Sequence, residues 1–238
     1  MTRLVSAIPL VAERTGSPVI VVGGLAVMFR LGTPYRTTSD LDTVDVQASR
    51  SRSHLEILLT GAPPSGPSGA LLDTPLGPVQ VDVLHVSEAE LAHPPQDETD
   101  RLHVQAHAWA AATATDLELT VDNTTRITVA VAEPGPIIAM KLQSIMNRGA
   151  AKEATDLLDI IRLTLDQQCG AASRIQLEHA DEQLRADGLL HAQKWFHEDA
   201  TRSLRKIRAI PEGRDIAADD VELVGDLLTA ALRRPRLT

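Results

Sequence analysis

An apolar run that ends in two glycines constrains the fold of this chain more than any other feature. The run covers residues 19–22, and Gly23 and Gly24 follow it directly. β-Branched residues in such a run are typical of a buried strand, and the glycine pair predicts a sharp turn into a helix over residues 25–32. Backbone amides at such a turn can hold a phosphate group. The sequence therefore predicts a strand, a phosphate-binding turn and a helix in direct succession.

Three aspartates on predicted strands are the candidate metal ligands. Asp40 and Asp42 are two residues apart in a segment that continues as an apolar strand, so their side chains share one face. Asp82 lies in a second strand, residues 78–84, in which valines alternate with Gln80 and Asp82. Carboxylate oxygens are the ligands that Mg²⁺ prefers. We therefore expect Asp40, Asp42 and Asp82 to form one divalent-metal site.

Composition limits the class of protein. A chain of 238 residues with 43% hydrophobic residues can bury a core, and its apolar runs are shorter than the roughly 18 residues that span a bilayer. The single cysteine, Cys169, cannot form an intrachain disulfide, which fits a reducing compartment. These features predict a cytoplasmic protein without a membrane partner. The net charge of −9 argues against a protein coated in nucleic acid, although it permits a local basic patch.

The chain divides into a mixed half and a helical half. Residues 1–133 combine strands with helices near 51–59 and 97–113, a loop over 61–69, and a hairpin of residues 117–122 and 126–131. Residues 134–238 read as helices near 136–147, 151–167, 173–187, 190–208 and 217–233, with breaks at Gly149, Gly170, Gly188 and Gly213. The predicted fold class is α/β (α+β): a mixed sheet with helices, followed by a C-terminal helical bundle.

The order of strand, Gly-Gly, helix, Asp-x-Asp strand and later strand acid resembles the DNA polymerase β-like nucleotidyltransferase superfamily over about residues 18–85. Within it, the strings Gly-Gly-Leu-Ala-Val and Arg-Thr-Thr-Ser-Asp-Leu-Asp look most like the AbiEii/AbiGii nucleotidyltransferase toxins. A second motif of that family, a helical Lys-Leu, an arginine and an Asp-x-x-Asp helix, is similar to Lys141-Leu142, Arg148 and the segment 156–159. This chain departs from the family in carrying Thr155 and Leu158, where an arginine and an aromatic residue are frequent.

The resemblance implies a nucleotidyltransferase fold and transfer of a nucleoside monophosphate from an NTP to an acceptor hydroxyl, with one or two Mg²⁺ ions. It implies the role of toxin in a toxin–antitoxin or phage-defence system, the 3′ end of tRNA as acceptor, and a cognate antitoxin encoded nearby. The catalytic candidates are Asp40, Asp42, Asp82, Lys141 and Asp156, with Asp159 open as the functional helix acid instead. The nucleotide-binding candidates are Gly23, Gly24, Arg36, Thr38, Ser39 and Lys141.

Lys141 has support from its surroundings in the sequence as well. Its ammonium would offset triphosphate charge, and it stands in an apolar helix segment in a chain with only four lysines. An exposed lysine of no special role is the alternative. Asp156 and Asp159 could equally form a solvated helix face.

The sequence leaves other functions open. The chain could be a small-molecule nucleotidyltransferase of the aminoglycoside type, or a nucleotide-binding module with a decayed site. Basic residues could contact RNA phosphates or form a solvated face paired with acids such as Asp199; these are Arg202, Arg205, Lys206, Arg208, Arg233, Arg234 and Arg236. His103 and His107 have helical spacing but no third ligand, and Trp195 and Phe196 are expected in the core.

Overall fold

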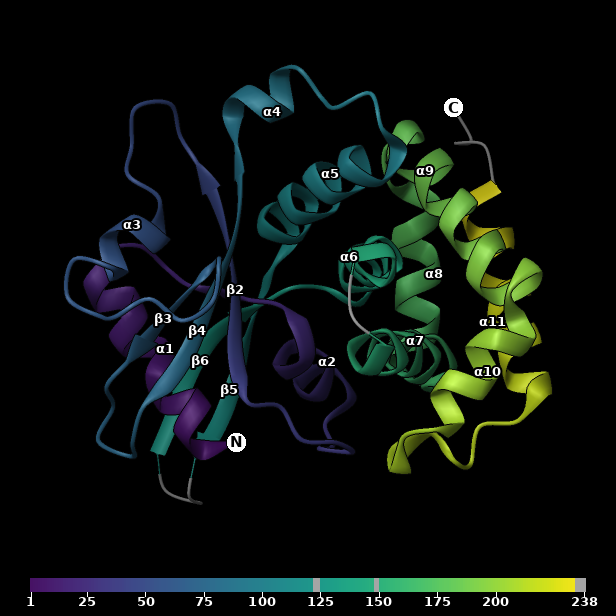
Figure 1. The fold of residues 1–238 in the computed structure, drawn as a ribbon, viewed down its shortest axis with the longest axis horizontal. Coiled ribbons are helices and arrows are strands. Elements are labelled where there is room, and N and C mark those ends of the chain that lie inside the picture. Colours follow the sequence, from purple (N-terminus) through teal and green to yellow (C-terminus); the bar gives the residue numbers. More distant parts are fainter. Residues whose placement is uncertain (122–124, 148–149, 234–238) are drawn as a thin grey trace. The chain divides into compact units, whose positions relative to one another are not determined.

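The computed structural model describes residues 1–121, 125–147 and 150–233, and it divides into two compact units (Figure 1). The first unit comprises residues 1–29, 36–93 and 107–133. The second comprises residues 30–35, 94–106 and 134–238. The expected fold class is confirmed, because a mixed sheet with helices is followed along the chain by a helical bundle.

The first unit contains a mixed sheet, whose strands in the described residues have the order β3-β4-β2-β1-β6-β5. Strands β2 and β4 are parallel, as are β1 and β6, and the other neighbours are antiparallel. Their bounds are Ile20–Val21 for β1, Asp40–Gln47 for β2, Gly69–Leu72 for β3, Val79–Ser87 for β4, Thr115–Val121 for β5 and Thr125–Val131 for β6. The expected hairpin is present as β5 and β6, and its connecting residues 122–124 lie outside the described residues.

Alternation along β4 explains how the sheet presents polar groups. Val79, Val81 and Val83 are buried, whereas Gln80 and Asp82 between them are half-buried, as the two-residue period of a strand requires. Helix α1 (Thr2–Thr15) packs against β2, β4 and α3 (His54–Leu58). Neither α1 nor β3 was predicted from the sequence. The other helices that begin in this half are α2 (Gly23–Leu31), α4 (Glu88–Ala92) and α5 (Glu98–Thr113).

The second unit is a helical bundle. Its long helices are α6 (Pro134–Ser144), α7 (Ala150–Leu165), α8 (Cys169–His179), α9 (Glu182–Gln193), α10 (Ala200–Arg208) and α11 (Ala218–Arg233). Helix α6 is buried from Pro134 to Gln143 and packs against α7, α8 and α9. A helix that is apolar all round belongs in a core. The short helical segments Ile145–Asn147, Lys194–Glu198 and Pro211–Gly213 complete the unit, with Trp195 and Phe196 in its core as expected.

Several predicted boundaries were wrong. Helix α2 begins at Gly23 rather than at residue 25, although Gly32 follows its end in the left-handed conformation, with φ 66°. Helix α3 begins only at His54, because Ser53 and Glu56 form a capping box.

Two of the glycines expected as helix breaks lie inside helices. Gly170 is the second residue of α8, and the break expected there lies just before it, between the end of α7 at Leu165 and Cys169. Gly188 lies inside α9, and the chain turns instead before Asp181, whose carboxylate accepts from two backbone amides at the start of α9. A Cβ on Gly188 would make an ordinary contact with Leu232 at 3.4 Å. Gly149 lies outside the described residues. No helix within the described ranges is both long and apolar enough to cross a membrane.

Candidate metal and phosphate site

The three predicted metal ligands converge on one place in the sheet of the first unit. In the parallel register of β2 and β4, Asp42 is directly opposite Asp82 and Asp40 is opposite Gln80. Ligand oxygens of Asp40, Asp42 and Asp82 all lie within 4.8 Å of one another, and all three residues are half-buried. Among the described residues, this is where histidine, cysteine or acidic side chains gather in metal-ligand geometry. The three aspartates that the sequence singles out therefore lie close together in the folded chain.

Neighbouring polar groups orient two of these carboxylates. Thr38 Oγ1 donates to Asp40 Oδ1 at 3.1 Å, and Gln80 Nε2 donates to Asp82 Oδ1 at 2.9 Å. Gln80 is itself held by Ser65 Oγ, which donates to Gln80 Oε1 at 3.0 Å. The sequence had indicated only that Gln80 shares the face of Asp82.

Glycine is required where the backbone approaches the acids. Gly23 has φ 65°, and a Cβ there would lie 1.9 Å from Asp42 Oδ2. A Cβ on Gly69, the first residue of β3, would lie 2.3 Å from Asp82 Oδ1. Side chains at either position would therefore displace a carboxylate of the triad.

The glycine turn also accommodates an arginine. A Cβ on Gly24 would lie 2.4 Å from Arg36 Nη2, so the guanidinium lies against the first turn of α2. Arg36 Nη1 donates to the carbonyl oxygen of Thr37 at 3.1 Å. The amino end of a helix carries partial positive charge, and a guanidinium beside it adds a full one. This combination suits an anion such as phosphate. Ser39, the remaining candidate from this segment, is exposed.

The chemistry of the triad fits Mg²⁺. All its ligands are carboxylate oxygens, and octahedral Mg²⁺ holds oxygens at about 2.1 Å, so ligands of one ion are up to about 4.2 Å apart. Ligand oxygens of Asp40, Asp42 and Asp82 that all lie within 4.8 Å of one another are compatible with this geometry. Three clustered carboxylates also repel one another unless a cation compensates them.

Lys141, the candidate from the second motif, is buried in the second unit. Its residue exposure is 6%, and its Nζ lies 2.7 Å from Asp156 Oδ1 and 2.6 Å from Asp159 Oδ2. The two aspartates are three residues apart on α7, which places them on one face of that helix. The alternative of an exposed lysine is wrong, as is that of a solvated Asp156 and Asp159 face. Both helix acids contact Lys141.

Two hydroxyl groups complete the cluster around Lys141. Ser144 Oγ donates to Asp156 Oδ2 at 2.9 Å, and the Tyr35 hydroxyl donates to Asp159 Oδ1. Each carboxylate therefore gives one oxygen to the ammonium and the other to a hydroxyl. Tyr35 and Ser144 were not predicted from the sequence, since a contact of Tyr35 with a residue 124 positions away has no local signal.

Most basic side chains of helix α10 form ion pairs or hydrogen bonds within the protein. Lys206 and Arg202 both form ion pairs with the buried Glu153 of α7, and Arg202 also pairs with Asp199. Arg208 Nε donates to the carbonyl oxygen of Ile216 at 2.9 Å. For most of the basic residues of α10, these contacts favour the interpretation as a solvated face paired with acids over the interpretation as an RNA contact. Arg233 is exposed; Arg234 and Arg236, together with Arg148, lie outside the described residues.

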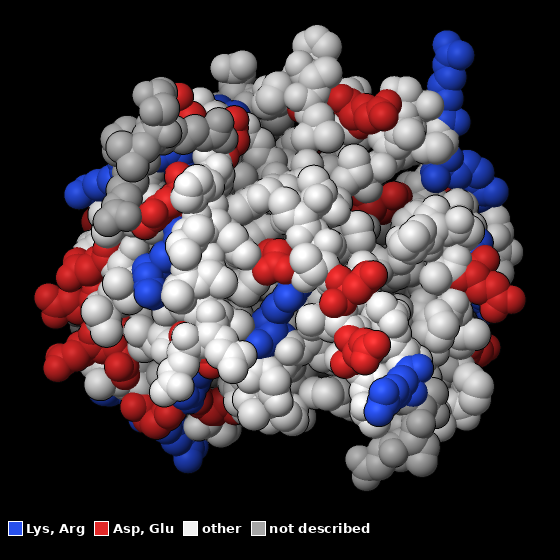
Figure 2. Space-filling model, turned by 180° about the vertical axis from the view of Figure 1, so that it is seen from behind, with Lys and Arg blue, Asp and Glu red and all other residues white. Residues whose placement is uncertain are grey.

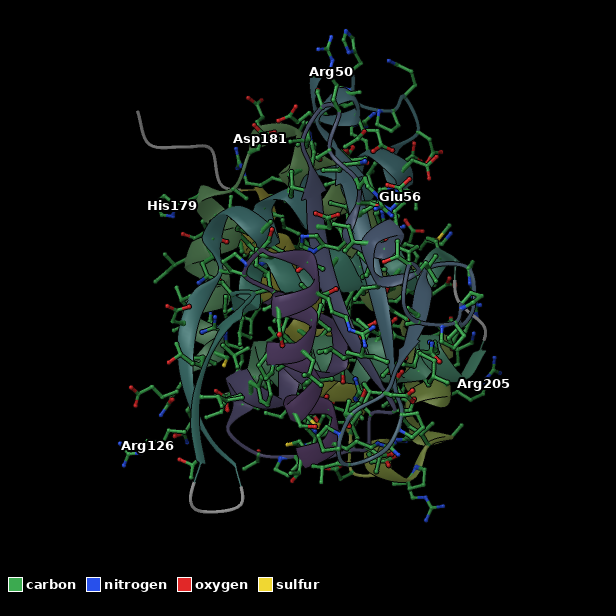
Figure 3. All side chains as sticks on the ribbon, turned by 90° about the vertical axis from the view of Figure 1, so that its left-hand side faces the viewer. Arg50, Glu56, Arg126, His179, Asp181 and Arg205 are labelled. Carbon is green, nitrogen blue, oxygen red and sulfur yellow. The ribbon has the colours of Figure 1, made fainter. Side chains whose placement is uncertain are left out.

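Arg205 is the exception on α10: it is exposed like Arg202 and Arg208, but within the described residues it forms no ion pair, and its side chain extends away from the ribbon (Figure 3). On the face drawn in Figure 2, the described basic and acidic side chains are interspersed rather than separated into two broad areas. This distribution agrees with the acidic balance of the sequence.

Histidines do not add a second metal centre within the described residues. His103 and His107 are both on α5, and neither belongs to a group of three ligand-type side chains. A different histidine, His191 on α9, is 4% exposed. Burial lowers the pKa of His191 below its ordinary value, against the opposing negative charge of Asp187.

Comparison with known proteins gives two structural similarities. No family model and no curated protein matches the chain. A crystal structure of an antigenic nucleotidyltransferase-like protein from Paracoccidioides brasiliensis is 20% identical, with a TM-score of 0.44 over 85% of this chain and 92% of that chain. The structure of a "putative nucleotidyltransferase" from H. pylori is 13% identical, with a TM-score of 0.46 over 97% of this chain and 93% of that chain. Neither similarity assigns a role to a residue of this chain.

Proposed function

We propose that this chain is a Mg²⁺-dependent nucleotidyltransferase that moves a nucleoside monophosphate from an NTP to an acceptor hydroxyl. The observation that carries the proposal is the convergence of Asp40, Asp42 and Asp82 within 4.8 Å, beside a glycine turn at the start of α2. An in-line transfer of this kind needs carboxylates that hold metal and donors that hold phosphate. The first unit supplies both kinds of group.

In the proposed reaction the acceptor oxygen forms a bond to the α-phosphorus as the bond from that phosphorus to the bridging oxygen breaks. The acceptor loses its proton and pyrophosphate leaves. Asp40, Asp42 and Asp82 would hold the metal, which supplies charge neutralisation and a lowered pKa of the attacking hydroxyl. The amides at the start of α2 and the Arg36 guanidinium would bind phosphate oxygens.

Lys141 has the proposed role of neutralising phosphate charge, with Asp156 as its partner. Support comes from the resemblance of Lys141-Leu142 and the 156–159 segment to the second motif of the toxin family, and from the buried ion pairs that hold the ammonium. A lysine kept charged in a buried position needs such partners, because an unpaired buried ammonium is costly.

The decisive experiment is labelling by each of the four NTPs. Purified protein, Mg²⁺, α-labelled NTP and total RNA are incubated, and the species that gains label is identified. We expect Asp42→Asn to abolish labelling and to weaken Mn²⁺ binding in calorimetry. The matched control is Asp73→Asn, an exposed aspartate that follows β3. Undiminished labelling in excess chelator, or by Asp42→Asn, would overturn the proposal, and NTP binding without turnover would indicate a decayed module.

We further propose the 3′ end of tRNA as the acceptor and the role of toxin in a toxin–antitoxin or phage-defence system with a cognate antitoxin. The support is the resemblance of the glycine, Asp-x-Asp and Lys-Leu strings to the AbiEii/AbiGii family. Label that enters tRNA and is lost when the tRNA 3′ end is oxidised with periodate beforehand would agree with this acceptor. Label in other RNA, or none in RNA, would contradict it.

A small-molecule acceptor is the second candidate, and a pocket in the second unit favours it. The pocket has a volume of about 400 Å³, and its lining residues include the aspartates Asp166, Asp215 and Asp220 and one arginine, Arg162, which pairs with Asp215. A lining with more negative than positive charge suits a molecule that bears amines. Adding an aminoglycoside and a neutral sugar as separate acceptors to the labelling assay distinguishes this candidate from RNA.

A further inference from the structure

The contacts of Tyr35 connect it to Lys141, although no sequence motif singles out this residue. Tyr35 belongs to the short segment 30–35 of the second unit, and five residues later the chain begins β2 at Asp40. Its hydroxyl donates to Asp159, whose other oxygen lies 2.6 Å from Lys141 Nζ. Tyr35 therefore contacts Lys141 through one shared carboxylate.

The hydroxyl affects how Asp159 holds the ammonium. Asp159 is fully buried, with 0% exposure, so the donors that it accepts from come from the protein rather than from bulk water. A hydroxyl donor takes up part of the negative charge of the carboxylate and fixes its rotation. Lys141 Nζ contacts both Asp156 and Asp159, so the position of these two carboxylates helps to fix where the ammonium lies.

The ring of Tyr35 is held independently of its hydroxyl. The guanidinium carbon of Arg162 lies 6.0 Å from the ring centroid, in the geometry of a cation–π contact. Removing the hydroxyl alone therefore leaves the ring in place. The two aspartates are held alike, because the Ser144 hydroxyl donates to Asp156 as the Tyr35 hydroxyl donates to Asp159.

We propose that Tyr35 is a positioning residue for Lys141, acting through Asp159; this inference rests on the proposed function for its effect on rate. Without the Tyr35 hydroxyl, the Asp159 carboxylate loses a donor that shares its charge and helps to orient it, and it binds the ammonium with more of its charge. The ammonium is then aimed less well at the phosphate charge that grows during transfer. Because such contacts act on the transition state, kcat falls while KM for the NTP changes little.

The first arm of the test observes the contact without any activity. Tyr35 is the single tyrosine and Lys141 one of four lysines, so ¹³C labels on tyrosine Cζ and lysine Cε give few signals. We expect Tyr35→Phe to move the Lys141 signal, assigned with Lys141→Arg, and to leave that of exposed Lys152 in place. The tyrosine signal should move in Asp159→Asn. An unmoved Lys141 signal in folded Tyr35→Phe overturns the proposal, and this result needs no variant of the buried acids.

The second arm measures transfer kinetics. We expect Tyr35→Phe to lower kcat about tenfold, the scale of a misdirected charge–charge contact. In an Asp159→Asn background the same change should cost less than about twofold, because the path to Lys141 is already broken. A full tenfold loss in both backgrounds overturns the proposal. If the wild-type chain transfers no nucleotide, the proposed function fails, while the spectroscopic arm still decides whether Tyr35 positions Lys141.

Discussion

Removing the charge of Lys141 should destabilise the second unit strongly. Lys141→Met keeps the length and apolar stem of the side chain but removes the ammonium that the Asp156 and Asp159 carboxylates contact. One positive charge is lost in a place where Lys141 is 7% and Asp159 0% exposed at the side chain. Breaking a buried ion pair by removing one partner costs about 3–5 kcal/mol. For a chain of this size that corresponds to a fall in Tm of roughly 6–20 °C.

The assay is denaturant unfolding observed through the second unit. The chain has two tryptophans, Trp109 in the first unit and Trp195 in the second. In a Trp109→Phe background, fluorescence therefore reports on Trp195. The loss should appear as a lower midpoint with an unchanged slope, since the same surface is exposed on unfolding.

A compensated variant separates charge from packing. Replacing Lys141 by Met together with Asp156→Asn and Asp159→Asn removes these three charges together, and amide oxygens can still accept from the hydroxyls of Tyr35 and Ser144. Neutral replacement of a complete buried ion cluster is often neutral or stabilising, so we expect this triple variant to recover most of the loss while transfer stays abolished. A Lys141→Met protein as stable as the wild type to within about 1 kcal/mol would refute the reasoning.

Further predictions concern the turn, one histidine and the basic helix. Gly23→Ala should cost at least twice as much stability as Gly16→Ala and should weaken Mn²⁺ binding. Both positions have positive φ, which costs about 1–2 kcal/mol for alanine, but only the Cβ at Gly23 meets Asp42. Equal losses in thermal unfolding would contradict this. Because burial lowers the pKa of His191, the unfolded chain binds more protons than the folded chain below about pH 6.5. The stability of the wild type should therefore fall between about pH 7 and pH 5 more steeply than that of His191→Gln. Parallel stability curves for the two proteins would count against this prediction. If RNA is the acceptor, Arg205→Gln should weaken labelling and reduce the slope of log affinity against log salt by about 0.9, whereas an unchanged slope places the RNA elsewhere.

The elements with a strong local pattern could be predicted from the sequence. Alternating valines place Asp82 on the polar face of its strand, and the two-residue spacing of Asp40 and Asp42 places both on one face. The hairpin, α5 and the end of α2 at Gly32 also follow from local pattern and turn residues. Boundaries set by other means were predicted less well. The start of α3 depends on a capping box, and the break expected at Gly188 is absent, because the side chain of Asp181 caps the start of α9 and the helix continues through Gly188.

The sequence by itself determined the order of the candidate ligands and the alternation that gives the acids a common face, because both are properties of neighbouring residues. Only the tertiary structure decided that Asp42 is opposite Asp82, since the register of strand residues 40 positions apart depends on long-range pairing. It also decided that Lys141 is buried between two carboxylates with the hydroxyls of Tyr35 and Ser144 beside them. A buried charge requires partners, but the sequence does not say which distant residues the fold will bring to it.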